Sequence, residues 1–214
     1  GIGSVTSSSG NVTVSGYTSS ATTTDYGIYS NTINVSASNG SVNFQGAKLD
    51  TVTTLANAVS NLSGSTPSPL FAIADSANPA FAASTGLSWT GTVTANTTNG
   101  YISIKAKAPS ITGTMTAYGL ALLSNNQNYT INNASNNISS LAASIGTGSL
   151  TFTTTSALNI GTYNGVTGIT AASVTLSAGG LTDTNDAGIT VTSSSTLAIT
   201  NATGSHDFSG VIAG

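Results

Sequence analysis

Three short stretches decide the fold of this chain: Ser149-Leu150-Thr151-Phe152-Thr153, Ser173-Val174-Thr175-Leu176-Ser177 and Thr196-Leu197-Ala198-Ile199-Thr200. Polar and apolar residues alternate in each stretch, which is typical of a β-strand with one face buried and the other in water. The stretches begin 24 and 23 residues apart. A period in the twenties with several short strands per repeat predicts a β-solenoid, in which each repeat forms one coil.

Two further series of short strands lie between these stretches. Residues 157–160 correspond to residues 180–183, and residues 168–171 correspond to residues 188–191. We therefore expect each period to carry three strands, and each strand to pair with its counterpart in the next coil. One coil alone cannot bury its apolar side chains, whereas stacked coils form a continuous internal column.

A looser form of the pattern recurs outside this region. Residues 10–16, 40–46 and 204–210 share the order Gly-x-x-x-apolar-x-Gly, which indicates that one unit recurs at both ends of the chain. Residues 99–104 repeat the turn and strand that begin at residue 39, after a gap of 60 residues, which leaves room for more than one coil or one decorated coil. The chain, 1–214, is thus predicted to be a single elongated all-β domain.

Two segments interrupt the repeat and are expected to be excursions outside the coils: 49–86 and 118–146. In the first, apolar residues recur at helical spacing over 49–62, with Asp50 as N-cap and with Gly64 and Pro67 as stop signals. This pattern predicts a short surface helix. The second segment has two apolar clusters around an Asn-rich middle.

Charge is nearly absent, since 4% of the residues are charged, against about 25% in an ordinary soluble domain. The charges are three Lys and six Asp, so the polar surface depends on Ser, Thr and Asn. Without a basic cluster, nucleic-acid binding is not expected. No apolar run approaches the roughly 18 residues of a transmembrane helix, so membrane insertion is not expected either. Because Gly1 is no initiator residue, we expect a processed chain or an excised segment of a longer one.

The carboxy-terminal repeats resemble those of a known family. Residues 148–213, especially 157–160, 173–181 and 189–192, are similar to the repeats of filamentous-haemagglutinin-type exoproteins, and residues 31–47 resemble them more faintly. In that family the repeats form a right-handed parallel β-helix, which makes the shaft of a long adhesin exported across the outer membrane of Gram-negative bacteria. The resemblance implies a segment of such a shaft, secreted or on the cell surface, with the two excursions outside the helix.

Two groups of polar residues invite a chemical interpretation. Ser205, His206 and Asp207 are adjacent, but neighbouring residues of a strand point to opposite faces, so they are not expected to converge as a catalytic triad. Asp183 and Asp186 fit turn residues better than a weak Ca²⁺ site, because the pattern has too few ligands for a Ca²⁺ loop. The chain is therefore not predicted to be an enzyme or to hold a cofactor or a metal.

Several surface features carry two interpretations each. Lys105 and Lys107 share one strand face, as a solvated edge or, alternatively, as a patch for acidic glycans. Core or cross-strand packing is the main interpretation of four aromatic residues, and a sugar-stacking surface is the alternative: Trp89, Tyr101, Tyr118 and Tyr129. Eight Asn-x-Ser/Thr sequons are candidate glycosylation sites: Asn11, Asn34, Asn61, Asn96, Asn128, Asn133, Asn137 and Asn201.

Together these features predict a non-catalytic extracellular protein. The leading hypothesis is a segment of a cell-surface adhesin or fibre shaft, which contacts a host-cell, glycan or matrix surface. The alternative is a filament subunit that associates with neighbouring copies by strand donation or coil stacking. A third hypothesis is ice binding, because Thr-x-Thr pairs on a face of the solenoid could form a flat Thr ladder, with examples in Thr92-Val93-Thr94, Thr151-Phe152-Thr153 and Thr190-Val191-Thr192.

Overall fold

The computed structural model describes strands of the amino-terminal half and most of the chain beyond residue 96. The described residues are 4–7, 12–16, 33–37, 42–46, 55–59, 69–75, 88–89, 92–94, 97–98, 100–105, 110–124, 126–163, 165–183, 186–192, 197–200, 206–208 and 211–213. Every helix or strand assigned among these residues is a β-strand, so the described part of the molecule is all-β.

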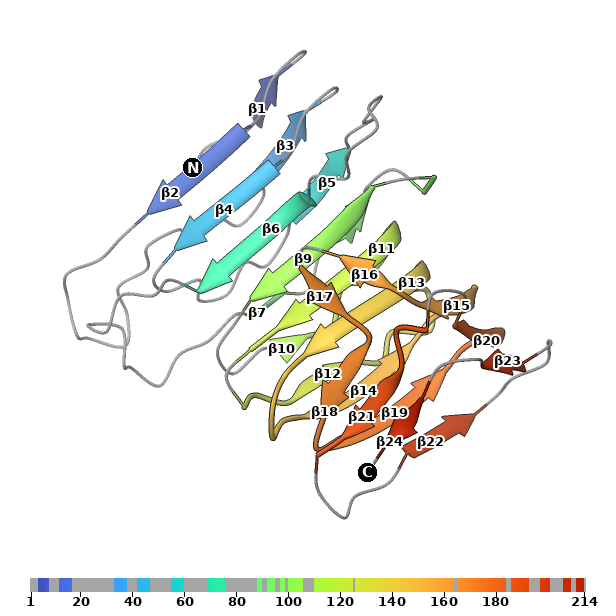
Figure 1. Ribbon diagram of the computed structural model, residues 1–214. Helices are drawn as coiled ribbons and strands as arrows, with labels where there is room; N and C mark the ends of the chain where they lie inside the picture. The colour runs from blue at the N-terminus through green and yellow to red at the C-terminus, as the bar shows by residue number, and fades with distance from the viewer. Residues whose placement is uncertain are drawn as a thin grey trace.

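The strands stack along one axis, with the amino-terminal strands at one end and the carboxy-terminal strands at the other (Figure 1). In chain order they are β1 (Ser4–Ser7), β2 (Val12–Gly16), β3 (Ile33–Ala37), β4 (Val42–Gly46), β5 (Leu55–Val59), β6 (Pro69–Asp75), β7 (Ser88–Trp89), β8 (Thr92–Thr94), β9 (Tyr101–Lys105), β10 (Ser110–Ile111), β11 (Thr114–Leu123), β12 (Tyr129–Ile131), β13 (Asn137–Ser144), β14 (Ser149–Thr153), β15 (Ala157–Ile160), β16 (Thr162–Tyr163), β17 (Val166–Thr167), β18 (Ile169–Ala171), β19 (Ser173–Ser177), β20 (Gly180–Asp183), β21 (Ile189–Val191), β22 (Leu197–Thr200), β23 (His206–Phe208) and β24 (Ile212–Ala213).

The pairing of these strands makes the molecule a parallel β-solenoid. One row of hydrogen-bonded strands runs β1-β3-β5-β8-β11-β13-β15-β20-β23, a second runs β2-β4-β6-β9-β11-β13-β18-β21-β24, and a third runs β12-β14-β19-β22. All pairs within these rows are parallel, whereas β16 and β17 form an antiparallel pair. Strands β11 and β13 belong to two rows, because each is long enough to pass from one face of the coil to the next.

The register of the carboxy-terminal coils confirms the repeat that the sequence predicts. Ser149 pairs with Ser173 at the start of β14 and β19. In the other two rows Leu158 pairs with Leu181, and residues 169–171 pair with 189–191. Because side chains alternate with a period of two, a slip of one residue would turn the apolar set outward, so the hydrophobic pattern fixes this register.

The amino-terminal strands confirm part of the looser pattern. Val42 of β4 pairs with Val12 on one side and with Phe71 on the other, and Phe71 pairs with Ile102. The gap of 60 residues therefore holds one intervening strand of the same row, β6. The prediction that residues 204–210 repeat the same unit is wrong, because β23 pairs with β20 in the other row. A pattern of two Gly and one apolar residue is too short to distinguish the two faces of a coil.

The predicted helix over 49–62 is also wrong, because Leu55–Val59 forms β5, which pairs with β3 and β8. Pro69–Asp75 forms β6 between β4 and β9, so the described parts of 49–86 belong to the coils. The apolar spacing from Leu55 to Val59 fits a helix and a strand alike. Neighbouring strand edges supply backbone hydrogen bonds on both sides, and this tertiary context selects the strand.

The second predicted excursion, 118–146, is corrected in the same way. This segment contains most of β11 and all of β12 and β13, which pair with strands before and after them. Its apolar clusters lie in the core, and its Asn-rich middle forms the corners between strands. Among the described residues, the short hairpin of β16 and β17 is an excursion from the parallel rows, and the repeat pattern does not predict it.

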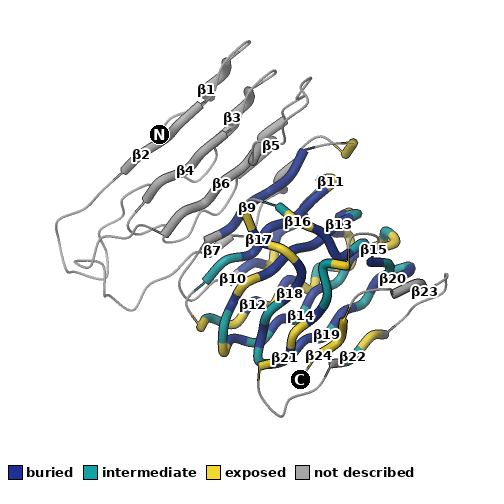
Figure 2. The backbone as a smooth tube through the Cα atoms, viewed as in Figure 1, coloured by how far each residue is buried: buried dark blue, intermediate teal, exposed yellow. Residues whose placement is uncertain are grey.

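The inner faces of the coils form one hydrophobic column. Ile131, Phe152 and Leu176 occupy the same position in successive coils of the third row, and all three are completely buried. Figure 2 shows buried segments recurring along β9, β11, β13 and β20. Full burial of a side chain of this size contributes about 1.5–3 kcal/mol, so the stacked column is the main source of stability.

Candidate functional site

The outer surface has a distinct feature at the corner where the first two rows of strands meet. In β11, Ala117 and Leu120 both belong to the hydrophobic core, so the two residues between them, Tyr118 and Gly119, lie outside it. Residues 139–140 take the same place in β13. Two consecutive outward residues mark the bend of each long strand.

A β-hairpin is inserted at this corner in the next coil. It consists of β16 and β17, joined through the Asn164-Gly165 sequence, and Gly165 has a φ of +74°. An Asn-Gly pair between short alternating segments favours a two-residue hairpin turn, because this turn requires positive φ. The base is closed by a 2.9 Å hydrogen bond from the N–H of Gly168 to the carbonyl oxygen of Gly161. The hairpin is thus a compact unit.

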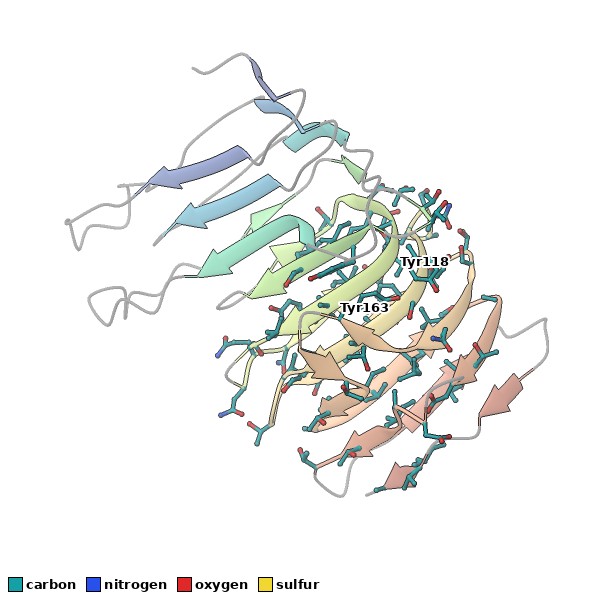
Figure 3. The ribbon with its side chains drawn as sticks, turned by 45° about the horizontal axis from the view of Figure 1, so that its top comes forward. Tyr118 and Tyr163 are labelled. Atoms are coloured by element: carbon teal, nitrogen blue, oxygen red, sulfur yellow. The ribbon has the colours of Figure 1, made fainter. Side chains whose placement is uncertain are left out.

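Tyr163 of the hairpin lies against β11. A Cβ atom on Gly119 would be 2.7 Å from the ring of Tyr163. The ring therefore fits against β11 only because Gly119 has no side chain. Its centroid lies 5.3 Å from that of Tyr101 at an interplanar angle of 44°, and 6.3 Å from that of Tyr118 at 77°. Figure 3 shows Tyr118 and Tyr163 next to each other. We name Tyr101, Tyr118 and Tyr163 the tyrosine cluster.

The hairpin packs on the long strands β11 and β13. Ala121 and Ala142, which pair in register on these strands, are completely buried and lie outside the connected cluster of core side chains. Val166 of β17 is buried as well. The hairpin therefore covers part of the outer face of β11 and β13.

The three rings of the cluster differ in exposure. Tyr101 is 2% exposed and Tyr118 is 37% exposed, whereas Tyr163 is half-buried. Burial raises the pKa of Tyr101 above its ordinary value of 10.0. Burial is also the largest cause that raises the pKa of Tyr163. The nearby Ser140 hydroxyl lowers this pKa, and the neighbouring Tyr118 raises it. Both Tyr101 and Tyr163 are therefore neutral phenols at physiological pH.

A row of neutral polar side chains continues from the cluster along the axis. Gly119, Ser140, Asn159 and Thr182 pair in register across four successive strands. The Oγ of Ser140 donates to the carbonyl oxygen of Asn159 at 3.1 Å, and the Nδ2 of Asn159 donates to the Oγ of Ser140 at 3.4 Å. The Oγ1 of Thr182 donates to the Oδ1 of Asn159 at 3.3 Å. We name Ser140, Asn159 and Thr182 the polar row.

The structure separates the aromatic residues that the sequence grouped. Tyr129 is completely buried in the core, and its hydroxyl donates to the carbonyl oxygen of Leu123 at 2.8 Å, so the core interpretation is confirmed for it. Tyr101 is also buried, packed against the ring of Tyr163, so the packing interpretation is confirmed for it as well, whereas Tyr118 is exposed beside Tyr163. Trp89 lies in β7, and its side chain is outside the described residues. Tyr163 was missed, although the Asn-Gly turn beside it is a readable signal.

The remaining polar candidates fall into described and undescribed parts. Asp183 is buried, and its carboxylate accepts hydrogen bonds from the N–H groups of Ala187 at 2.9 Å and Gly188 at 2.8 Å, as expected of a turn residue. Asp186 is exposed, with a φ of +50°. Three further candidates lie in strands whose backbone alone is described: Lys105 in β9, and His206 and Asp207 in β23. Ser205 and Lys107 are outside the described residues.

The sequons also differ in what is described. Asn128 and Asn137 are exposed, and Asn133 is half-buried, with its Nδ2 donating to the carbonyl oxygen of Thr112 at 2.9 Å. Asn34 lies in β3, and its side chain is not described. Outside the described residues lie Asn11, Asn61, Asn96 and Asn201. Glycosylation stays a prediction.

Comparison of the chain with protein-family models, curated proteins and solved structures gives no match. Among the described residues, no helix is long and apolar enough to cross a membrane. In the same part of the chain, no three His, Cys, Asp or Glu side chains gather where they would hold a metal ion. The tyrosine cluster and the polar row together form the candidate site among the described residues.

Proposed function

We propose that this chain is a non-catalytic structural or adhesive protein of the cell surface or extracellular space, a segment of an adhesin or fibre shaft. The observation that carries this proposal is the set of neutral polar rows on the outside of the solenoid. On the third row of strands, Thr151 pairs with Thr175, and Thr153 pairs with Ser177. Stacked coils make a stiff rod, and its hydroxyl rows favour many short-range contacts with another surface.

The resemblance of residues 148–213 to filamentous-haemagglutinin-type repeats supports the same proposal, because those repeats also form a shaft. The partner of the chain would be a host-cell, glycan or matrix surface. Only 4% of the residues are charged, so long-range attraction between charges is weak. Contact through hydroxyl and amide groups does not depend on such attraction.

An adhesion assay tests this proposal. Beads coated with the purified chain are expected to adhere to cultured cells or to immobilised matrix more strongly than beads coated with an unrelated all-β protein. Soluble chain in excess should compete. If the coated beads adhere no better than the control beads on every surface tried, the adhesive function is wrong.

The alternative is a self-assembling filament subunit, in which contact between copies would bury apolar side chains that the described part of the chain leaves exposed in and beside β22 and β24. Ile199, Val211 and Ile212 are 41%, 72% and 52% exposed. Ile199 pairs with Leu176, and Ile212 pairs with Ile189, so both continue the stacking of core residues. Electron microscopy of the concentrated chain should show fibres if copies stack coil on coil, and Ile199→Lys together with Ile212→Lys should abolish them. A chain that stays monomeric at high concentration would exclude this alternative.

A further inference from the structure

We propose that the tyrosine cluster and the polar row bind a pyranose ring of an uncharged glycan. This inference rests on the proposed adhesive function and names the chemical class of its ligand. A pyranose ring has an apolar C–H face and a rim of hydroxyl groups. It therefore needs an aromatic platform with hydrogen-bonding side chains beside it.

The platform is formed by Tyr118 and Tyr163. Tyr118 has the exposed ring, and the ring of Tyr163 stands nearly perpendicular to it at 77°. Such a pair offers a face and an edge to the same ligand, and Tyr provides a large amphipathic contact area with few rotatable bonds.

The platform is already held in place before a ligand binds. Tyr163 packs into the space above Gly119 and against Tyr101, and its backbone belongs to the hairpin closed at Gly161 and Gly168. Side chains that are ordered in the free protein lose little conformational entropy on binding, so more of the contact energy remains as affinity.

The polar row supplies partners for sugar hydroxyls next to the platform. Ser140 is buried beneath the row, so the accessible partners are Asn159 and Thr182, which follow in the next two coils and are both half-exposed. Successive strands of a sheet are about 4.8 Å apart, a distance that one sugar ring spans. Two of the hydrogen bonds of Asn159, those with Ser140 and Thr182, are 3.4 and 3.3 Å long, at the weak end of the range, so sugar hydroxyls can compete for these two contacts.

The charge of the surroundings selects an uncharged glycan. Among the described side chains the acidic and basic residues are Asp183 and Asp186, and Asp183 is buried against the backbone of its own loop. An acidic glycan requires Lys or Arg for charge-assisted hydrogen bonds, and the whole sequence has no Arg and three Lys, of which Lys105 is in the same strand as Tyr101 but four residues away from it.

Affinity electrophoresis of the full chain tests the inference. The gels contain soluble glucomannan, mannan or hydroxyethyl cellulose as uncharged probes, and heparin as the acidic probe. At least one uncharged polymer should retard the chain, and heparin should not. Tyr118→Ala is expected to raise the apparent Kd about tenfold, whereas Tyr118→Phe, which keeps the ring, should stay within about threefold. Thr130→Ala, an exposed change in β12 on another face, serves as the matched control and should bind like the unchanged chain.

The outcomes separate this inference from the adhesive function. Retardation only by heparin, no retardation by any uncharged polymer, or equal binding by Tyr118→Ala would overturn the inference. If the beads still adhere in that case, the adhesive function stands and acts through another surface. If the beads fail to adhere while Tyr118-dependent retardation is present, the glycan site stands and the adhesive function is wrong. Circular dichroism of each variant confirms that the fold is retained, as expected for an exposed ring.

Discussion

At the scale of single residues, asparagine side chains join one coil to the next. Asn136 is completely buried, its Oδ1 accepts from the N–H of Met115 at 2.9 Å, and its Nδ2 donates to the carbonyl oxygen of Thr153 at 3.1 Å. Asn136 thus forms hydrogen bonds with the preceding coil and with the following coil. Three other asparagines of the Asn-rich segment also bond backbone groups 21 residues away: Asn126, Asn128 and Asn133. The Asn-rich middle of the predicted excursion therefore supplies hydrogen bonds that connect one coil to the next.

Replacing Asn136 should be costly for this reason. Asn136→Ala leaves the N–H of Met115 and the carbonyl oxygen of Thr153 without their side-chain partner in a buried place, and an unsatisfied buried group costs about 1–3 kcal/mol. We expect a loss of about 2–4 kcal/mol in the free energy of unfolding, measured by urea denaturation. Asn132→Ala, an exposed neighbour, should change it by less than about 0.5 kcal/mol. Equal effects of the two changes would contradict the connecting role of Asn136.

Two glycines with the same backbone conformation allow a second residue-scale prediction. Gly165 and Gly168 have φ values of +74° and +71°. A Cβ on Gly168 would lie 2.0 Å from the carbonyl oxygen of Ala187, whereas nothing lies within 4 Å of one on Gly165. Gly165→Ala should cost only the left-handed strain of about 1–2 kcal/mol. Gly168→Ala adds a backbone clash to the same strain, so its thermal midpoint should be clearly lower. Similar midpoints would show that the coils move apart easily at this corner.

At the scale of elements, the hairpin of β16 and β17 acts as a strap over the long strands. It starts in the coil of β15 and reaches back to β11 and β9 through the contacts of Tyr163 with Gly119, Tyr101 and Tyr118. Parallel strands form the rest of the described pairs. The hairpin therefore stabilises the stack by side-chain packing across coils and not by adding a strand to a row.

Truncation of Tyr163 measures the contribution of this strap. Tyr163→Ala removes a half-buried ring and uncovers Tyr101, so we expect a loss of about 2 kcal/mol in the free energy of unfolding. Thr162→Ala, which removes an exposed hydroxyl from the same hairpin, should lie within about 0.5 kcal/mol of the unchanged chain. If the two variants unfold at the same urea concentration, the hairpin does not support the coils.

The buried tyrosines also predict a loss of stability at high pH. Tyr101 and Tyr163 have a pKa above 10.0 in the folded chain, so the folded state holds these protons more tightly than the unfolded state. Their contribution to stability is complete below about pH 10 and decreases as the pH rises through the folded pKa values. Unfolding midpoints measured from pH 8 to pH 11 should decrease only at the alkaline end. Tyr163→Phe keeps the ring without its proton, so the decrease should be smaller; an unchanged decrease would contradict this.

At the scale of the whole molecule, the solenoid combines an apolar column inside with hydroxyl and amide rows outside. With three Lys and six Asp in 214 residues, few ion pairs are available to hold the coils together. Stability must therefore come from burial and hydrogen bonds. This arrangement suits an extended surface, because neutral rows neither repel nor attract at long range.

Insensitivity to salt follows from the scarcity of charge. The melting temperature should change by no more than about 2–3 °C between low salt and about 0.5 M NaCl, since screening acts on few charges. Differential scanning calorimetry at several salt concentrations measures this. A large shift would mean that undescribed parts of the chain bring charges together.

The sequence by itself determined the all-β class and the register of the carboxy-terminal coils. In those coils, strand periodicity and repeat length agree, so residues 149–153 and 173–177 have one way to stack. Only the tertiary structure decided that Leu55–Val59 is a strand and that 118–146 runs within the coils, because apolar spacing there fits more than one element and the edges of neighbouring strands select the outcome. The tertiary structure also brought the three residues of the tyrosine cluster together. Tyr163 meets Gly119 through the fold of a hairpin, and a contact so far apart in sequence has no local signature.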